Sequence, residues 1–293
     1  MRIDLNCGIL YAKGSDAHMG ENVTQFRDYL INEEKSNETI TKYLRDVSAF
    51  LRWIGNREIT KSAVLSYKTE ILGKYAPKSV NSMLASLNVF LKFIKKFDCT
   101  VKSIKLQRQM FSDKELTKAE YERLLIAAEK KKNKRLYYLM QSICSTGIRV
   151  SEHKYITAEA VEKGSVRINL KGKMRVVILP KTLCKMLKKY IKEENIKSGS
   201  VFITKNGKPL DRSNIWNDMK KLCESAGVDK EKVFPHNLRH LFARTYYSLQ
   251  KDISRLADIL GHTSINTTRI YTIESGEVHR RQIERMNLLR FRE

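Results

Sequence analysis

The C-terminal half of this chain carries arginine, histidine and tyrosine residues in short fragments that lie far apart in sequence. The fragments and their residues of interest are S-T-G-I-R-V-S-E (145–152, Arg149), P-H-N-L-R-H (235–240, His236 and Arg239), L-G-H (260–262, His262) and R-I-Y-T (269–272, Tyr271). Each residue alone has an ordinary explanation, because most arginines are solvated surface charges and a tyrosine usually packs. Their chemical roles make sense only together, so the sequence requires a fold that brings the fragments to one place.

These residue types suit the cleavage of a phosphodiester by a tyrosine. A phosphate under in-line attack gathers negative charge on its non-bridging oxygens, and a guanidinium offers them paired donors that stay protonated. We therefore interpret Arg149 and Arg239 as the phosphate clamp, with His236 and His262 as further donors. His236 is also the better candidate to accept the tyrosine proton. Tyr271 is the candidate nucleophile, because a phenol with a pKa of about 10 leaves again more easily than an alkoxide.

The charge balance favours a polyanionic partner. Lysine and arginine number 56 against 32 acidic residues, which gives a formal net charge of +24 and a pI near 9.8. A globular chain keeps such an excess mainly when it binds nucleic acid, although a merely basic soluble protein or one that lies on a membrane surface is the alternative. We see neither an apolar run long enough to span a bilayer nor a signal peptide, so we expect a cytoplasmic protein.

The cysteines predict neither a disulfide framework nor a metal site. They lie tens of residues apart, without a C-x-x-C pair or a ligand set with histidine, at Cys7, Cys99, Cys144, Cys184 and Cys223. This spacing is typical of core thiols in a reducing compartment.

The N-terminal half reads as a helical bundle. Apolar residues at Ile40, Leu44, Val47, Leu51 and Ile54 form one helical stripe over 39–54. A second stripe follows Pro77, and weaker helices are expected over 23–31 and 64–75, which gives a four-helix bundle. Lysines and arginines on the polar faces suit contacts to phosphates, which fix the register of a duplex without reading its sequence.

The C-terminal half mixes helices with a hairpin. A basic stretch without periodicity, 102–114, leads to a capping box at Thr117 and Glu120, after which helices are expected over 118–130 and 134–144. Residues 166–170 alternate as a strand, Gly172 turns the chain, and 175–179 returns as a second strand before a proline.

In this order, the fragments resemble the catalytic signature of the tyrosine recombinase family, which includes phage integrases and Xer-like proteins. The resemblance implies a lysine at the hairpin that reaches the cleaved phosphate and protonates the leaving 5′ oxygen. The K-G-K-M-R run at 171–175 is one residue shorter than the common form, so Lys173 and Lys171 are both candidates, and the spacing to Arg175 favours Lys173. Glu152 is expected to orient Arg149 or a histidine rather than to touch DNA.

The same resemblance covers nearly the whole chain and implies its organisation. It predicts a mainly α fold with a small antiparallel β-sheet in the catalytic domain, the two domains forming a clamp around duplex DNA. The expected parts are an N-terminal tail (1–20), a four-helix core-binding domain (21–104), a linker (105–115), a mixed α+β catalytic domain (116–275) and a C-terminal tail (276–293). The short N-terminal tail leaves no room for an arm-binding domain. The C-terminal tail, with Ile283, Met286 and Leu289 at helical spacing, is expected to dock on a neighbouring subunit or on its own catalytic domain.

The implied activity is site-specific recombination, as integration, excision, inversion or resolution, through a 3′-phosphotyrosine intermediate. Such a reaction needs no metal and no ATP, because the phosphotyrosine keeps the bond energy. The implied partners are double-stranded DNA with inverted-repeat core sites and further copies of the chain, as a dimer on one site and a tetramer in synapsis. Two alternatives stay open: a type IB topoisomerase, and a non-catalytic regulator in which 253–271 acts as a helix-turn-helix.

Overall fold

A computed structural model describes residues 16–106, 115–170, 173–271 and 283–286. The chain divides into two compact units, Met1–Arg108 and Gln109–Glu293. No helix among the described residues is long and apolar enough to cross a membrane.

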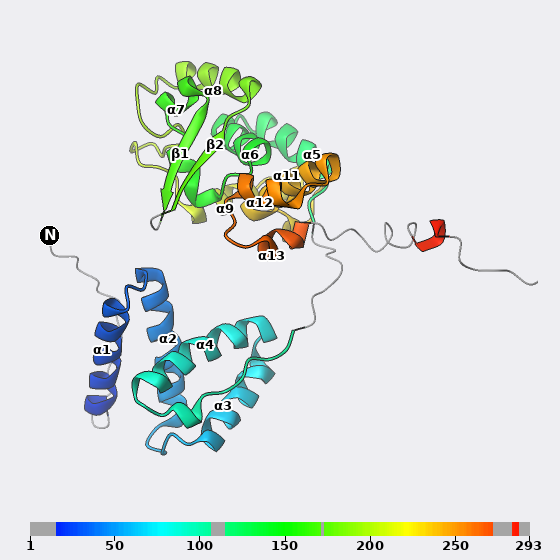
Figure 1. Ribbon diagram of the computed structural model, residues 1–293. Helices are drawn as coiled ribbons and strands as arrows, with labels where there is room; N and C mark the ends of the chain where they lie inside the picture. The colour runs from blue at the N-terminus through cyan, green and yellow to red at the C-terminus, as the bar shows by residue number, and fades with distance from the viewer. Residues whose placement is uncertain (1–15, 107–114, 171–172, 272–282, 287–293) are drawn as a thin grey trace, which may run out of the picture. The chain divides into compact units, whose positions relative to one another are not determined.

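The described residues of the first unit form four α-helices and a short 3-10 turn (Figure 1), which are in chain order α1 (Asp16–Asn32), α2 (Asn37–Ile54), α3 (Lys61–Lys74), α4 (Pro77–Phe93) and η1 (Phe97–Cys99). The stripe predicted for α2 is largely buried, with Val47 and Ile54 almost fully covered. Aromatic rings close the core, where Phe26 meets the edge of Phe90 at 5.2 Å between ring centroids. The helical bundle expected from the periodicity is confirmed.

Two asparagines of α4 hold the chain as it leaves this bundle. Asn88 donates to the carbonyl of Val101 at 2.8 Å and accepts from its N–H at 2.9 Å. Asn81 exchanges the same pair of bonds with Ile104, at 2.9 and 2.7 Å. Each side-chain amide therefore makes the pair of hydrogen bonds that a neighbouring strand would make, and this fixes the direction of the chain before the expected linker. Most of that linker (107–114) lies outside the described residues.

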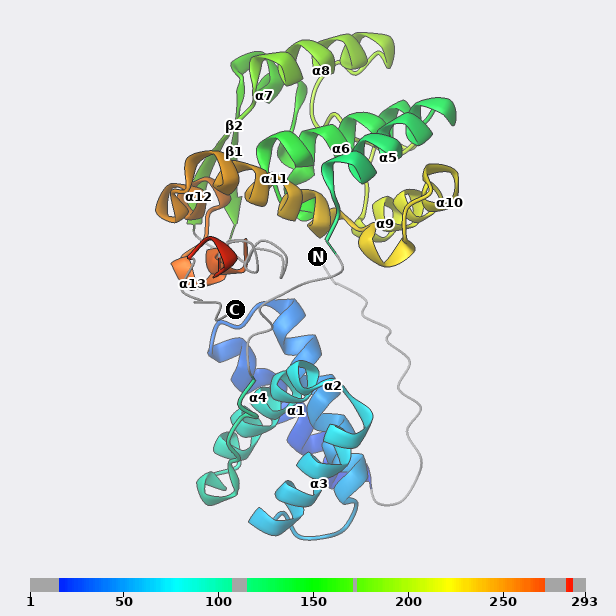
Figure 2. The same cartoon turned by 90° about the vertical axis from the view of Figure 1, so that its right-hand side faces the viewer.

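The second unit carries the remaining elements (Figure 2), which are α5 (Lys118–Lys130), α6 (Lys134–Thr146), η2 (Val150–Tyr155), α7 (Ala158–Lys163), β1 (Ser165–Leu170), β2 (Lys173–Ile178), α8 (Lys181–Glu193), α9 (Arg212–Lys220), α10 (Cys223–Ala226), η3 (Lys230–Lys232), α11 (Pro235–Gln250), α12 (Ile253–Leu260), α13 (Ile265–Thr268) and η4 (Arg269–Tyr271). Helix α11 packs against α6, and the hairpin lies beside α7 and α8 (Figures 1 and 2). The strands β1 and β2 pair antiparallel, with Ile168 opposite Arg175 and Leu170 opposite Lys173. The expected class, mainly α with a small antiparallel sheet, is confirmed.

Local signals in the sequence position several of these elements. The capping box forms at the start of α5, where the Thr117 hydroxyl accepts from the Glu120 N–H at 3.1 Å and the Glu120 carboxylate accepts from the Thr117 N–H at 2.8 Å. Helix α6 ends at Gly147, whose φ of 65° is the left-handed region that favours glycine. A Cβ at Gly147 would stand 2.5 Å from the Phe242 ring, so a larger residue would separate α6 from α11.

The ends of the chain are described only in part. Of the C-terminal tail predicted as a docking helix, only 283–286 is described, where Ile283 and Met286 are exposed and Leu289 lies beyond. Cys99 and Cys223 are buried and Cys144 and Cys184 half-buried, while Cys7 lies outside the described residues.

Candidate active site

The first clamp candidate, Arg149, lies between the end of α6 and the first turn of η2. Its backbone N–H donates to the Glu152 carboxylate at 2.9 Å, and its guanidinium donates to the same carboxylate at 3.0 Å. The other guanidinium nitrogen donates to the carbonyl of Gly261 at 3.3 Å. The side chain remains 40% exposed, so Arg149 is held on one side and open to an incoming phosphate on the other.

Glu152 is the buried anion of the site. Its side chain is 1% exposed and accepts from Arg149 and, by a short ion pair, from Arg175. Burial alone would raise the pKa of this carboxyl, but the N–H of Arg149 and the two guanidinium groups outweigh burial and hold the pKa below its ordinary value. Glu152 is thus ionised at neutral pH and fixed in place, as an orienting group must be.

The second clamp candidate, Arg239, is buried. It lies on the second turn of α11, is 2% exposed, and donates to the carbonyls of Gly147 and of Leu260, the latter at 2.8 Å. Burial and the nearby Arg149 charge lower the pKa of Arg239 to about 10, and the neighbouring Tyr271 opposes this shift. Arg239 therefore stays charged at neutral pH and ties the turns after α6 and α12 together.

His262 follows the glycine that ends α12. Its Nε2 lies 3.0 Å from a guanidinium nitrogen of Arg239, and its Nδ1 lies 2.8 Å from the hydroxyl of buried Thr268. Since a guanidinium only donates, Nε2 accepts and the ring proton is on Nδ1. Burial and the Arg239 and Arg149 charges lower the pKa of His262 to about 4, so the ring is neutral in the protein alone.

Tyr271 ends the described catalytic segment and is 2% exposed. Its ring meets the edge of His240 at 4.6 Å between centroids and stacks on His262 at 6.0 Å. His240 in turn meets His236 edge-on at 4.5 Å, and burial together with His236 lowers the pKa of His240 to about 4. His240 therefore lies as a neutral ring between the exposed His236 and the nucleophile candidate.

The structure brings Arg239, His262 and Tyr271 into one hydrogen-bonded and stacked group. Arg149 is bound to the same turn through the Gly261 carbonyl, and His236 lies at the edge of the group. It leaves the hairpin lysine undecided. The backbone of Lys173 begins β2 opposite Leu170, but its side chain, like all of Lys171, lies outside what the structure describes.

Sequence reasoning missed one member of the group, Arg175. We used this residue only to judge the spacing of Lys173, whereas its guanidinium reaches both Glu152 and the carbonyl of Ile259, the latter at 3.0 Å. The alternation along β2 carried the signal, since Met174 and Val176 are exposed and Val177 is buried. Arg175 lies two residues before the buried Val177 and therefore on the same face of the strand, so its side chain has to point inward.

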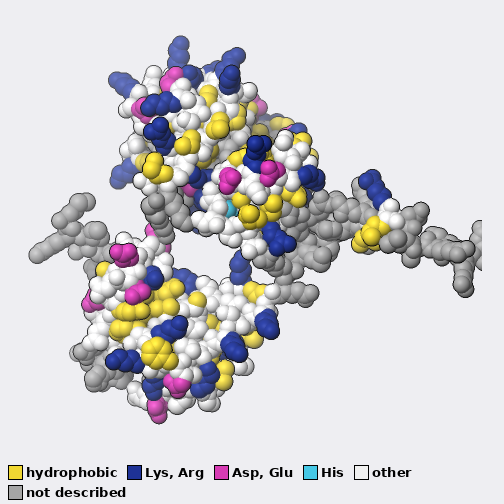
Figure 3. All heavy atoms as spheres, viewed as in Figure 1, with side chains coloured by type: hydrophobic (Ala, Val, Ile, Leu, Met, Phe, Trp, Pro, Cys, Tyr) yellow, Lys and Arg dark blue, Asp and Glu magenta, His cyan; other side chains and the backbone are white. Residues whose placement is uncertain are grey.

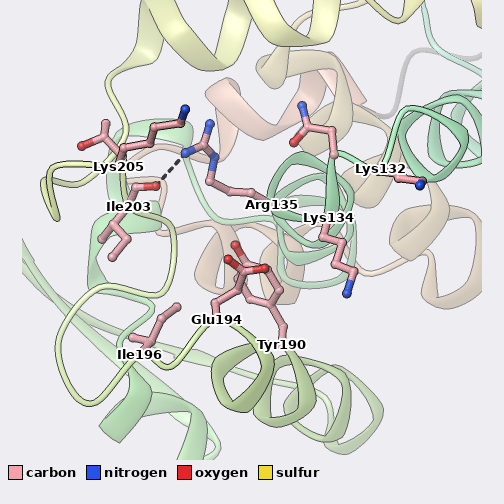
Figure 4. A pocket seen from close by; sticks show the side chains of 10 residues that line it. Lys132, Lys134, Arg135, Tyr190, Glu194, Ile196, Ile203 and Lys205 are labelled. Atoms are coloured by element: carbon pink, nitrogen blue, oxygen red, sulfur yellow. Dashed lines mark hydrogen bonds between the residues drawn. The ribbon is translucent and has the colours of Figure 1, made fainter.

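One hollow of the second unit lies away from this group. A cavity of about 480 Å³ lies between the start of α6 and the loop at 203–205, where Arg135 donates to the carbonyl of Ile203 at 2.8 Å (Figure 4). It sits at the end of α6 opposite to Arg149, and no candidate catalytic residue lines it. Lysine and arginine side chains instead spread over the visible surface of both units (Figure 3), as expected for a protein whose partner is too large for a pocket.

Comparisons with known proteins follow the same lines. Residues 114–277 match the phage integrase family, and residues 23–96 match the phage integrase N-terminal SAM-like domain. Tyrosine recombinase XerA of Pyrococcus furiosus is 31% identical over 280 residues, which cover 92% of this chain and 95% of that protein.

Solved structures share the fold. A lambda integrase (75–356) dimer bound to a COC′ core site gives a TM-score of 0.70 at 17% identity, covering 86% of this chain and 94% of that one. A lambda integrase tetramer bound to a Holliday junction gives 0.70 at 17% identity, covering 86% and 76%.

Proposed function

The chain belongs to the phage integrase family and is a site-specific tyrosine recombinase, and we propose that it cleaves and rejoins duplex DNA through a 3′-phosphotyrosine formed on Tyr271. The observation that carries this proposal is the grouping of Arg149, Arg239 and His262 around that tyrosine. Cations held in advance beside one hydroxyl suit a reaction whose transition state is more negative than its substrate.

In the proposed reaction, Arg149 binds the scissile phosphate through its exposed side. The guanidinium of Arg239 exchanges its hydrogen bonds to the Gly147 and Leu260 carbonyls for bonds to the non-bridging oxygens of the phosphate. The Tyr271 oxygen attacks phosphorus in line and forms the new P–O bond while the bond to the 5′ oxygen breaks. The tyrosine proton passes to His236, from which the His240 ring separates Tyr271 in the DNA-free protein, so the transfer requires a shift of Tyr271. Lys173 protonates the leaving 5′ oxygen. Attack of another 5′ hydroxyl on the phosphotyrosine reverses these steps and rejoins the strand.

The burial of Tyr271 adds a condition to this mechanism. At 2% exposure, the hydroxyl meets no phosphate until η4 or its neighbours shift. We propose that DNA binding supplies this shift, because an arriving phosphate competes with the Gly147 and Leu260 carbonyls for Arg239 and so loosens the contacts that hold Tyr271 and His262. A nucleophile covered in this way cannot attack a phosphodiester at the wrong site.

We propose as partners double-stranded DNA with inverted-repeat core sites and further copies of the chain, a dimer on one site and a tetramer in synapsis. The dimer and tetramer of lambda integrase on DNA support this assembly, and the net charge of +24 supports the DNA contact. Residues 21–104 would bind the core site, 105–115 would link, 116–275 would catalyse, and 276–293 would dock between subunits. We place the reaction in the cytoplasm.

A plasmid assay tests the function. The DNA that flanks the gene of this protein is searched for inverted repeats as candidate sites, and a supercoiled plasmid with two copies of such a site should give inversion or deletion products when the protein is added. A matched plasmid without the sites should stay supercoiled. If instead both plasmids relax and neither recombines, the chain is a nicking-closing enzyme of the topoisomerase type.

The hairpin lysine gives a second prediction. Lys173→Ala should slow cleavage of an ordinary diester by about 100- to 10,000-fold, the usual contribution of a general acid. A substrate with sulfur at the 5′-bridging position should restore the rate, because a thiolate leaves without a proton. Single-turnover cleavage of nicked suicide duplexes measures both, with Lys171→Ala as the matched control. Rescue of Lys171→Ala in place of Lys173→Ala would move the acid to Lys171.

A further inference from the structure

Arg175 connects parts of the active site that belong to different elements. It lies on β2 opposite Ile168, and its side chain, 14% exposed, crosses from the hairpin to the end of α12. One guanidinium nitrogen donates to the carbonyl of Ile259 at 3.0 Å, and the other forms the short ion pair with Glu152. The residue therefore spans from the strand to both the η2 turn and the α12 turn.

Through Glu152, Arg175 shares an anchor with Arg149. The carboxylate oxygen that pairs with Arg175 also accepts the backbone N–H of Arg149, and the second oxygen accepts the Arg149 guanidinium at 3.0 Å. If Arg175 were lost, Glu152 would keep its bonds to Arg149 but lose the cation on its other side. Glu152 and Arg149 would then be able to rotate together as a pair.

The α12 turn leaves room for this arrangement. A Cβ added to Gly261 would lie 2.5 Å from Cδ of Arg175, so the glycine lets the arginine stem pass beside the backbone. The carbonyls of this turn hold the clamp residues, because Gly261 accepts from Arg149 at 3.3 Å and Leu260 accepts from Arg239 at 2.8 Å. By binding the Ile259 carbonyl, Arg175 fixes the turn to which both Arg149 and Arg239 are hydrogen-bonded.

Stability alone is a poor explanation for such a residue. The Nε of Arg175 is buried and has no hydrogen-bond partner within the described part of the chain, and leaving a buried donor unsatisfied costs free energy. Buried ion pairs also often stabilise less than apolar residues of the same volume. The contacts are instead well suited to fixing an orientation.

We propose that Arg175 is a positioning residue that acts through Glu152 to hold the Arg149 guanidinium in the orientation that receives the scissile phosphate. The proposal rests on the proposed function, specifically on the contact of Arg149 with the phosphate. It predicts that replacing Arg175 hardly slows cleavage any further once Arg149 has been replaced.

The test is a double-mutant cycle on single-turnover cleavage of a nicked suicide duplex at saturating protein. Arg175→Met, which keeps length but removes charge and donors, should slow cleavage on the order of 10- to 100-fold, the cost of a misplaced catalytic group. In an Arg149→Ala background the same change should cost less than about threefold. Arg175→Lys should recover part of the rate, since one ammonium reaches one of the two acceptors. Arg167→Met, an exposed arginine on the paired strand β1, is the matched control and should cleave normally.

A methylphosphonate at the scissile position separates the positioning role of Arg175 from the proposed phosphate contact of Arg149, on which that role rests. With one charged oxygen replaced by a methyl group, the transition state needs less cationic support, so the losses of Arg175→Met and Arg149→Ala should both shrink. A rate loss for Arg175→Met that multiplies with that of Arg149→Ala overturns the positioning role, whatever the methylphosphonate shows. An unchanged loss for Arg149→Ala on the methylphosphonate overturns the phosphate contact of Arg149, while the double-mutant cycle still decides the coupling. If Arg175→Met does not fold, Arg175→Lys supplies the cycle.

Discussion

Tyr271→Phe is expected to abolish the covalent protein–DNA complex while leaving the fold and the DNA affinity of the protein unchanged. The substitution removes one oxygen and keeps a ring of the same shape. That ring is 2% exposed and packs against His240 and His262, so phenylalanine retains the contacts that bury it. Without the phenol oxygen no phosphotyrosine can form, and the loss of cleavage should be complete rather than partial.

A nicked suicide duplex measures this result, because the cut strand diffuses away and the protein stays attached to the DNA. Wild-type protein should give an adduct that resists denaturation, and Tyr271→Phe should give none at equal binding in a gel shift. Tyr246→Phe and Tyr247→Phe are the matched controls, since both tyrosines lie on α11 against the same small cluster. An adduct that persists in Tyr271→Phe and disappears in one of these would assign the nucleophile to α11.

The sequence was sufficient where a local pattern has one physical explanation. The apolar stripe of α2 can be buried only as a helix, and the Thr117–Glu120 capping box satisfies the N–H groups that a helix start leaves unpaired. Gly147 and Gly261 end α6 and α12 in the left-handed conformation. The ordered fragments were informative for a different reason, because a shared chemical task relates residues that are distant in sequence.

The sequence was insufficient where a role depends on which elements meet. Arg239 was predicted as a phosphate clamp, but its burial against the carbonyls of Gly147 and Leu260 was not predicted, because nothing local shows that α11 lies between those turns. Arg175 was missed for the same reason, since its partners Glu152 and Ile259 lie on other elements.

Arg239→Lys is expected to slow cleavage on the order of 100- to 1,000-fold, the loss typical of one donor held in advance for a developing charge. Arginine serves here because its planar fork reaches several acceptors at once, whereas a lysine ammonium is a single point of contact. The pKa of Arg239, lowered to about 10 by burial and by Arg149, still keeps it charged at neutral pH. The same burial would lower the pKa of a lysine at this position as well, so a rate deficit that persists unchanged when the pH is lowered comes from geometry and not from loss of charge.

Alanine would be a poor choice at this position. Removing the side chain leaves the buried carbonyls of Gly147 and Leu260 without their donor, at about 1–3 kcal/mol for each unsatisfied group, and opens a void between α6, α11 and α12. A slow Arg239→Ala protein would then combine a damaged fold with a damaged site. Lysine keeps one donor and much of the volume, so the melting temperature of Arg239→Lys should fall less than that of the alanine variant.

Suicide-substrate cleavage, gel shift and thermal melting of the same preparations together decide the role of Arg239. Arg244→Lys is the matched control, because it makes the same substitution on the same helix at a residue that pairs with Glu115; it should cleave at nearly the wild-type rate. Arg239→Lys should bind DNA nearly as well as wild type, since many phosphate contacts contribute to affinity and only one of them changes. Cleavage at the wild-type rate by a folded Arg239→Lys protein would show that Arg239 only holds the turns after α6 and α12 together. Arg149 and the histidines would then bind the phosphate without it.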